Sequence, residues 1–187
     1  MRLFVAQEIP AVVRENFAAL LASFRAITKE PRWVRAENLH VTLKFLGEVA
    51  ESKLDAVRNA LGEIRSDKVV ALEFRGLGFF PNEKHPRVLW AGMEASLNLR
   101  TLVADIEGAM EELGFPCEKK EFSPHLTLAR LERPRLPEAL RNAIAENHRR
   151  EFGSLRTNEF HLIHSKLKPT GAEYTTVATF RFAPVAE

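Results

Sequence analysis

Apolar and polar positions follow patterns that predict a regular series of strands and helices. The stretch "RLFVAQEI" predicts a strand over residues 2–9, and apolar residues at three-four spacing after Pro10 predict a helix with one buried face. "HVTLKFLG" alternates over residues 40–47 as a half-buried strand does. A second helix is expected to start near Ser52, and a strand follows over residues 69–80.

The second half of the chain repeats this order and then adds two strands. Its predicted segments are a strand at 87–95, a helix that ends before Gly114, a strand at 125–131, a short helix at 137–144, and strands at 159–167 and 174–182. Strand, helix, strand, helix and strand therefore recur as a unit.

A shift of 85 positions aligns the two halves. His40 then falls on His125 and Thr42 on Thr127 without a gap, while Leu3 falls on Val88. We see no low-complexity or Gly/Ser-rich linker between the halves. We therefore predict two intertwined lobes related by an approximate two-fold axis, packed as one domain over residues 1–187. Such symmetry would place the two histidine strands on opposite walls of one cleft.

Each half contains one His-x-Thr motif, "HVT" at 40–42 and "HLT" at 125–127. The composition predicts about 0.3 such matches by chance, so a single motif would be weak support for a site. Two motifs in the same register of a repeat favour function over the ordinary explanation, which is a hydrogen-bonded or surface histidine. Along a strand, residues two apart share a face, so each motif presents an imidazole and a hydroxyl together.

Two basic residues near the motifs are further candidates. Strict alternation places Lys44 on the face of His40 and places Arg130 opposite His125, unless a bulge turns Arg130 inward. A guanidinium suits an anionic phosphate, so Arg130 is a candidate substrate-binding residue, although a surface salt bridge would also explain it. His161 and His164 fall on opposite faces of one strand, which disfavours a shared metal site.

Composition limits the class of protein. The net charge is +2, with 27 basic and 25 acidic residues, which disfavours binding to a long nucleic-acid backbone but leaves room for one phosphate. Cys117 is the only cysteine, so neither disulfides nor a cysteine zinc site are expected. No apolar run approaches the roughly 20 residues needed to span a bilayer, and the N-terminus does not read as a signal peptide. We expect a cytoplasmic monomer with no membrane association.

Five stretches resemble one known superfamily in its usual order. They are "RLFVAQEIP", "ENLHVTLKFLGEV", "PRVLWAG", "FSPHLTLARL" and "KPTGAEYTTVATFRF", and together they extend from Arg2 to Phe182. The chain resembles the 2H phosphoesterases, which are named for two H-x-T motifs, and among them the LigT-like RNA 2′,3′-cyclic phosphodiesterases, long called 2′-5′ RNA ligases. The resemblance implies an α+β, bilobal fold with two antiparallel sheets lining a central cleft and helices on the outside.

The resemblance also implies a reaction and roles for five residues. An RNA 2′,3′-cyclic phosphate end would be hydrolysed to a 2′-phosphomonoester, with His40 as proton donor and His125 as proton acceptor. Thr42, Thr127 and Arg130 would bind the phosphate. No metal and no cofactor are expected. The near-symmetry of the repeat leaves the reverse assignment of the two histidines open, and the reverse reaction would make a 2′-5′ RNA linkage.

Two other functions remain open from the sequence. The first is a non-catalytic module that binds an RNA end or a nucleotide. The second is a metal-dependent phosphohydrolase with His40 and His125 as ligands, which the lack of an acidic cluster disfavours. A tRNA half, another RNA end or a small cyclic nucleotide would each be a plausible substrate. A nucleoside triphosphate effector is also open, although the chain has no Gly-rich phosphate loop.

Overall fold

The computed structural model describes residues 1–133, 135–169 and 171–184. The strands are β1 (Arg2–Glu8), β2 (Arg32–Trp33), β3 (His40–Glu48), β4 (Val70–Phe80), β5 (Val88–Ala95), β6 (His125–Arg130), β7 (Glu151–Thr157), β8 (Glu159–Lys168) and β9 (Gly171–Arg181). The α-helices are α1 (Ala11–Ile27), α2 (Leu54–Gly62), α3 (Asn98–Glu112) and α4 (Glu138–Glu146), and the 3-10 helices are η1 (Ala36–Asn38) and η2 (Glu51–Lys53).

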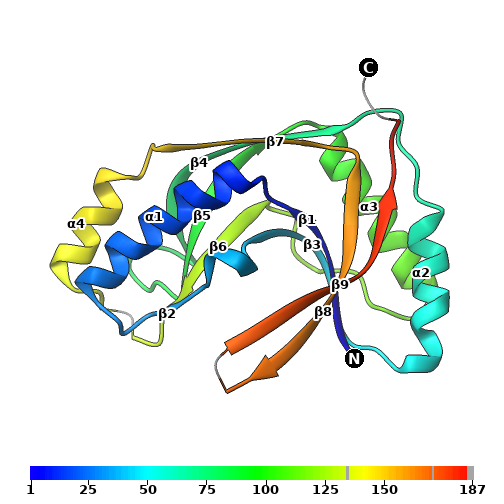
Figure 1. Ribbon diagram of the computed structural model, residues 1–187, viewed down its shortest axis with the longest axis horizontal. Helices are drawn as coiled ribbons and strands as arrows, with labels where there is room; N and C mark the ends of the chain where they lie inside the picture. The colour runs from blue at the N-terminus through cyan, green and yellow to red at the C-terminus, as the bar shows by residue number, and fades with distance from the viewer. Residues whose placement is uncertain (134, 170, 185–187) are drawn as a thin grey trace.

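Two antiparallel sheets organise the molecule, with helices outside them (Figure 1). Sheet A has the strand order β3-β1-β8-β9, and sheet B has the order β2-β6-β5-β4-β7. Helices α2 and α3 contact strands of sheet A, whereas α1 contacts β7 of sheet B and α4 packs against α1. The predicted α+β class, with two antiparallel sheets and outer helices, is confirmed.

Each lobe is built from both halves of the chain. β4 belongs to the first half but lies in sheet B, between β5 and β7. α1 follows a strand of sheet A and crosses to sheet B, where Phe17 stacks on Phe152 at a ring-centroid distance of 4.3 Å. α3 makes the reciprocal crossing, from β5 of sheet B to β3 of sheet A. Neither sheet would be complete if the chain were divided between its halves.

The strand orders of the two sheets agree with the predicted repeat, but the alignment of the two halves needs one correction. The order β3-β1-β8-β9 corresponds to β6-β5-β4-β7, so the two motif strands are equivalent. In the paired registers, however, Ala6 lies opposite Thr42 and Trp90 lies opposite Thr127. Ala6 therefore corresponds to Trp90, an offset of 84, whereas an offset of 85 aligns the histidines. The predicted offset of 85 is therefore wrong by one residue for the alignment of β1 with β5.

One face of each sheet packs into the main core, and we call the opposite face its site face. On sheet A, Leu3, Val5 and Val41 are buried in the core, while His40 and Thr42 lie on the site face. The site face also has a small apolar cluster of its own, in which Phe4, Ala6 and Ile163 are buried and Tyr174 packs against them. On sheet B, Leu126 and Leu128 are in the core, and His125 and Thr127 are on the site face.

Strand β7 was not predicted from the sequence. In "EFGSLRT" only Phe152 and Leu155 are buried, and this spacing of three is not the spacing of two that indicates a strand. Gly153 further weakens the strand pattern and takes a φ of +117° where Val13 of α1 approaches. Pairing with β4 holds the segment extended, which is a tertiary effect.

The helices are all short. α1 is 17 residues long, and within the described ranges no helix has the length and apolar composition needed to cross a membrane.

Candidate active site

Both His-x-Thr motifs begin a strand, and these two strands contact each other although they belong to different sheets. The Nδ1 atom of His40 lies 2.6 Å from the carbonyl oxygen of Asn38, and Nδ1 of His125 lies 2.8 Å from that of Ser123. In each motif the partner is the residue two positions earlier. The repeat therefore extends to the hydrogen bonds that orient the rings.

These bonds determine which ring nitrogen is available. A carbonyl oxygen can only accept, so Nδ1 must carry the proton in both rings. The neutral tautomer then has a free lone pair at Nε2, which can accept a proton. Neither Nε2 has a protein partner within the part of the chain that the structure describes. Two orientated imidazoles, one from each sheet, can thus serve as a proton donor and a proton acceptor.

The threonine hydroxyls are also available. Thr42 and Thr127 are each half-buried, two residues after their histidine and on the same face. Neither hydroxyl hydrogen-bonds to another protein group among the described residues. A hydroxyl in that position can donate to an anionic oxygen held beside the histidine.

A β-bulge follows each motif at the same place. In β3 the register against β1 shifts so that Leu43 has no partner, and in β6 the register against β5 shifts at Leu128. Each bulge inverts the alternation of the strand beyond it. The residue after the bulge, Lys44 or Ala129, is buried, and the one after that, Phe45 or Arg130, is exposed.

Arg130 therefore returns to the site face, because the bulge at Leu128 reverses its expected orientation. Burial raises the pKa of the Tyr174 hydroxyl, and the positive charges of Arg130 and Arg2 oppose this rise. The charge of Arg130, on sheet B, therefore acts on Tyr174 of sheet A. Among the described residues Arg130 forms no ion pair, so its charge is available to an anion.

Lys44, in contrast, does not reach the site, and its expected position on the face of His40 was wrong. Its Nζ atom lies 2.5 Å from Oε2 of Glu107 and donates to the carbonyl oxygen of Pro116 at 3.0 Å. Its side chain is fully buried. The bulge turns Lys44 toward α3, where Glu107 neutralises it. Phe45 takes the outward position and is 58% exposed.

His40 is enclosed by aromatic rings. Phe4 lies at a centroid distance of 4.7 Å and a tilt of 31°, and Tyr174 approaches edge-on at 5.2 Å. Burial lowers the pKa of His40 to about 4, a shift that the Asn38 carbonyl opposes and the charge of Arg14 supports. In the free protein at neutral pH, His40 is therefore a neutral imidazole.

His125 has a simpler environment. Phe80 meets it edge-on at a centroid distance of 5.0 Å, and the Phe80 ring in turn lies 5.2 Å from Trp90. Trp90 occupies the position that Ala6 has in sheet A, and its indole ring lies directly over Gly78. The aromatic neighbours of His125 therefore come from its own sheet.

Sequence reasoning missed three residues around His40, namely Phe4, Asn38 and Tyr174. All three lie inside stretches that carry the family resemblance. Phe4 lies in a strand that is buried on both faces, with only the two end residues exposed, so no alternation of apolar and polar residues marks its side chain as part of a site. Only the pairing of β1, β8 and β9 brings Phe4 and Tyr174 to the site face.

Two histidines lie on opposite faces of β8, as expected. His161 pairs with Ala6, whose other partner is Thr42, so His161 lies on the site face, whereas His164 pairs with Leu3 on the core face. Over residues 1–133, 135–169 and 171–184, no three His, Cys, Asp or Glu side chains are grouped so that they could hold a metal ion.

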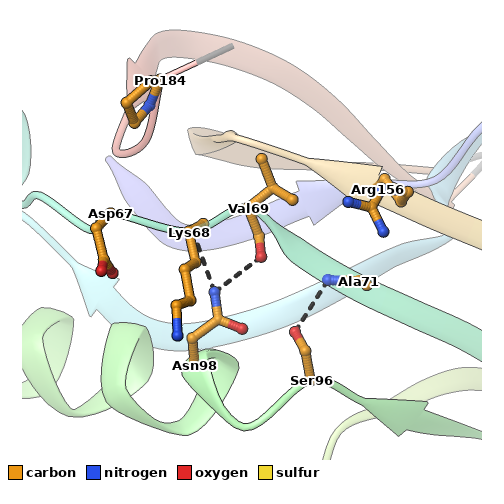
Figure 2. A pocket seen from close by; sticks show the side chains of 8 residues that line it. All are labelled: Asp67, Lys68, Val69, Ala71, Ser96, Asn98, Arg156 and Pro184. Carbon is orange, nitrogen blue, oxygen red and sulfur yellow. Dashed lines mark hydrogen bonds between the residues drawn. The ribbon is translucent and has the colours of Figure 1, made fainter. Parts of the chain in front are cut away.

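A cavity of about 450 Å³ opens at the N-terminus of α3 (Figure 2). There Asn98 donates to the carbonyl oxygens of Lys68 and Val69, and the Ser96 hydroxyl accepts from the amide of Ala71. No residue of either His-x-Thr motif lines this cavity. The site is therefore defined by the side chains of β3 and β6 and not by this cavity.

Comparison with known proteins assigns the chain to a family. The family described as LigT like Phosphoesterase matches residues 8–90 and 93–174, and each segment contains one His-x-Thr motif. The chain belongs to this family of phosphoesterases. A relative from Methanothermobacter thermautotrophicus, named RNA 2′,3′-cyclic phosphodiesterase, is 32% identical over 97% of this chain and 98% of its own length.

Solved structures show the same fold. TT0787 of Thermus thermophilus superposes with a TM-score of 0.77 at 33% identity, covering 97% of this chain and 98% of that protein. Escherichia coli LigT in complex with 3′-AMP gives a TM-score of 0.76 at 28% identity, covering 98% of each chain. The similarity therefore covers both lobes.

Proposed function

We propose that the protein hydrolyses RNA 2′,3′-cyclic phosphate ends to 2′-phosphomonoesters by acid/base catalysis with two histidines. One observation carries the proposal: His40 and His125, on contacting strands of two sheets, both have Nδ1 bound to a backbone carbonyl and Nε2 without a protein partner among the described residues. The names of the relatives, and a 3′-nucleotide bound to one neighbour, support RNA ends or small cyclic nucleotides as substrates.

The reaction makes one bond to phosphorus and breaks another. His125 accepts a proton from water, whose oxygen attacks phosphorus, while His40 donates a proton to the departing 3′-oxygen. Thr42 and Thr127 donate to the non-bridging oxygens, and Arg130 balances their charge. Each histidine contributes roughly 10²–10⁴-fold to the rate. All five side chains belong to one chain, so a single domain acting as a monomer would contain every group that the proposed step uses.

This assignment requires His40 to gain a proton before it donates one. Its pKa is about 4 in the free protein, because burial disfavours the imidazolium. A phosphate anion next to the ring would favour the charged form and raise this pKa. Substrate binding would thus prepare the acid. The same groups, acting in the same direction but with a 5′-hydroxyl in place of water as the nucleophile, would join RNA ends through a 2′-5′ linkage.

The decisive experiment uses a short RNA with a 2′,3′-cyclic phosphate end, in excess EDTA. The wild type is expected to form the 2′-phosphate, and His40→Ala and His125→Ala are expected to lose this activity. His148→Ala is the matched control, since His148 also bonds through Nδ1 to a backbone carbonyl, that of Ala145, outside the motifs.

Three results would contradict the proposal. Activity retained in either motif variant would exclude the two-histidine mechanism, and activity lost in EDTA would favour a metal-dependent phosphohydrolase. RNA binding without turnover by the wild type would indicate a binding module.

A further inference from the structure

Asn38 makes two hydrogen bonds that connect His40 to a distant hairpin. Its carbonyl oxygen accepts from Nδ1 of His40 at 2.6 Å. Its side-chain Nδ2 donates to the carbonyl oxygen of Ala172, in β9, at 2.8 Å. One residue of η1 therefore holds both the histidine ring and the outer end of the β8–β9 hairpin, 134 positions along the chain.

Tyr174 follows Ala172 by two residues on β9 and reaches the same ring. Its centroid lies 5.2 Å from that of His40 at an interplanar angle of 76°, and 5.1 Å from that of Phe4. Phe4 contacts a second part of the His40 ring at 4.7 Å. Three aromatic rings thus pack together, and Tyr174 is the one that the hairpin supplies. The β8–β9 hairpin therefore supplies one of the two rings that cover His40.

The equivalent connection is missing around His125. Ser123 supplies the carbonyl that Asn38 supplies to His40, but its side chain makes no hydrogen bond among the described residues. Phe80 contacts His125 from β4, which is already paired with β5. Because the two motifs match so closely in other respects, the hairpin contact is a specific addition to the His40 side.

We propose that Asn38 and Tyr174 are positioning residues for His40: Asn38 connects the β8–β9 hairpin to the motif, and the Tyr174 ring holds the imidazole orientated and shielded from water. Neither residue needs to touch the reacting atoms. The catalytic part of this inference rests on the proposed function, whereas the structural part concerns the His40 ring alone. A displacement of about 1 Å in a catalytic group can reduce a rate by about 10²-fold, so such positioning matters.

The charged groups around His40 define the control conditions. Glu8 lies opposite His40 on β1 and accepts a hydrogen bond from the Thr176 hydroxyl of β9. Arg14 of α1 donates to the Glu37 carbonyl in η1, and its charge acts on His40. On the Tyr174 side the nearby charges are Arg2 and Arg130. The proposed variants alter none of these groups.

The test combines kinetics with NMR titration of the histidine ring protons. Tyr174→Ala is expected to lower the pH-independent maximum of kcat about 10- to 100-fold with KM changed less than about twofold, and Asn38→Ala to lower it about three- to tenfold. In both variants the pKa of His40 should rise from about 4 toward its ordinary value near 6.5, since water reaches the ring. At pH 7 the ring-proton chemical shifts of His125 serve as an internal reference for the fold of sheet B and should be the same in both variants as in the wild type.

Two variants keep the test independent of folding. Tyr174→Phe retains the ring and should behave as the wild type, because packing and not the hydroxyl positions His40. Asn158→Ala is the matched control for Asn38→Ala: Asn158 also donates through Nδ2 to a backbone carbonyl, that of Ala183 at 3.0 Å, but forms no contact with His40.

The outcomes separate the inference from the proposed function. An unchanged His40 pKa in Tyr174→Ala, or a changed pKa with unchanged kcat, would overturn the positioning role. A loss of activity in Tyr174→Phe as large as in Tyr174→Ala would assign the effect to the hydroxyl and would also overturn it. If the wild type shows no hydrolysis, the proposed function fails, and the titration alone still decides whether the hairpin encloses His40.

Discussion

His40 and His125 occupy equivalent positions in two equivalent strands, yet their surroundings differ. Both begin a strand, both bond through Nδ1 to a carbonyl two residues earlier, and both precede a bulge at the same distance. Beyond that, His40 is enclosed by Phe4 and Tyr174, whereas His125 meets a single ring, that of Phe80, among the described residues.

The difference shows which properties belong to the motif and which belong to its neighbours. The motif itself sets the tautomer of each ring, because Nδ1 donates to the carbonyl oxygen two residues earlier. The degree of burial comes from strands remote in sequence: β9 covers His40, and β4 supplies Phe80 to His125. A duplicated motif can thus provide two histidines whose chemistry differs.

The largest expected effect distinguishes the acid from the base. A cyclic phosphate analogue with sulfur in place of the bridging 3′-oxygen has a leaving group that needs no proton. We expect this analogue to restore most of the roughly 10²–10⁴-fold rate loss in His40→Ala but not in His125→Ala. The measurement is kcat for both substrates in each variant. Rescue of His125→Ala instead would reverse the two roles.

The second prediction concerns the residues after the two bulges. Lys44 is a buried cation paired with Glu107, while the equivalent Ala129 is apolar. Lys44→Met leaves the Glu107 carboxylate without its partner and should lower the free energy of unfolding by about 3–5 kcal/mol, measured by urea denaturation. As a control, Arg181→Met removes the exposed pair with Glu159 and should cost less than about 1 kcal/mol. Equal losses would show that the Lys44 pair is not buried in solution.

The third prediction is a pH dependence of stability caused by His40. Its pKa is about 4 in the folded protein and about 6.5 when unfolded, so the unfolded state binds more protons between these values. The contribution of His40 to the free energy of unfolding is complete above pH ~6.5 and is lost as the pH falls toward ~4. Below pH ~4 it no longer changes with pH. The loss is about 3 kcal/mol, from 1.36 kcal/mol per pKa unit.

The free energy of unfolding, measured with urea, should therefore fall more between pH 7 and pH 4 in the wild type than in His40→Gln. Parallel curves for the two proteins would show that His40 is not buried in solution. Taking the difference between the two proteins removes the contribution of the carboxylates, which also titrate in this range.

The smallest expected effect tests the residues that the bulges expose. Arg130 is turned to the site face on β6, at the position that Phe45 takes on β3. Arg130→Gln should lower kcat/KM for a cyclic phosphate by roughly tenfold, because a charge-assisted hydrogen bond to the phosphate is lost. Arg141→Gln on α4 should leave kcat/KM unchanged. A similar loss in both variants would attribute the effect to net charge alone.

Most of the regular elements were predictable because their patterns are strong. The predicted strands and helices correspond to β1, α1, β3, α2, β4, β5, α3, β6, α4, β8 and β9. β7 was missed because its two buried residues are three apart, and β2 because two residues form no pattern. Lys44 was placed on the wrong face because a one-residue bulge cannot be seen in an alternating sequence.

The sequence alone determined the duplication, the two histidine–threonine pairs and the local bonds that follow from them, because these depend on residue types at short, fixed spacing. The tertiary structure decided how the halves exchange β4, α1 and α3, which way the bulges turn Arg130 and Lys44, and how β9 encloses His40. These features depend on pairings between distant segments, and the bond between Thr176 and Glu8 joins residues 168 positions apart. Such pairings depend on the free energy of the whole packed chain, which no single stretch of sequence determines.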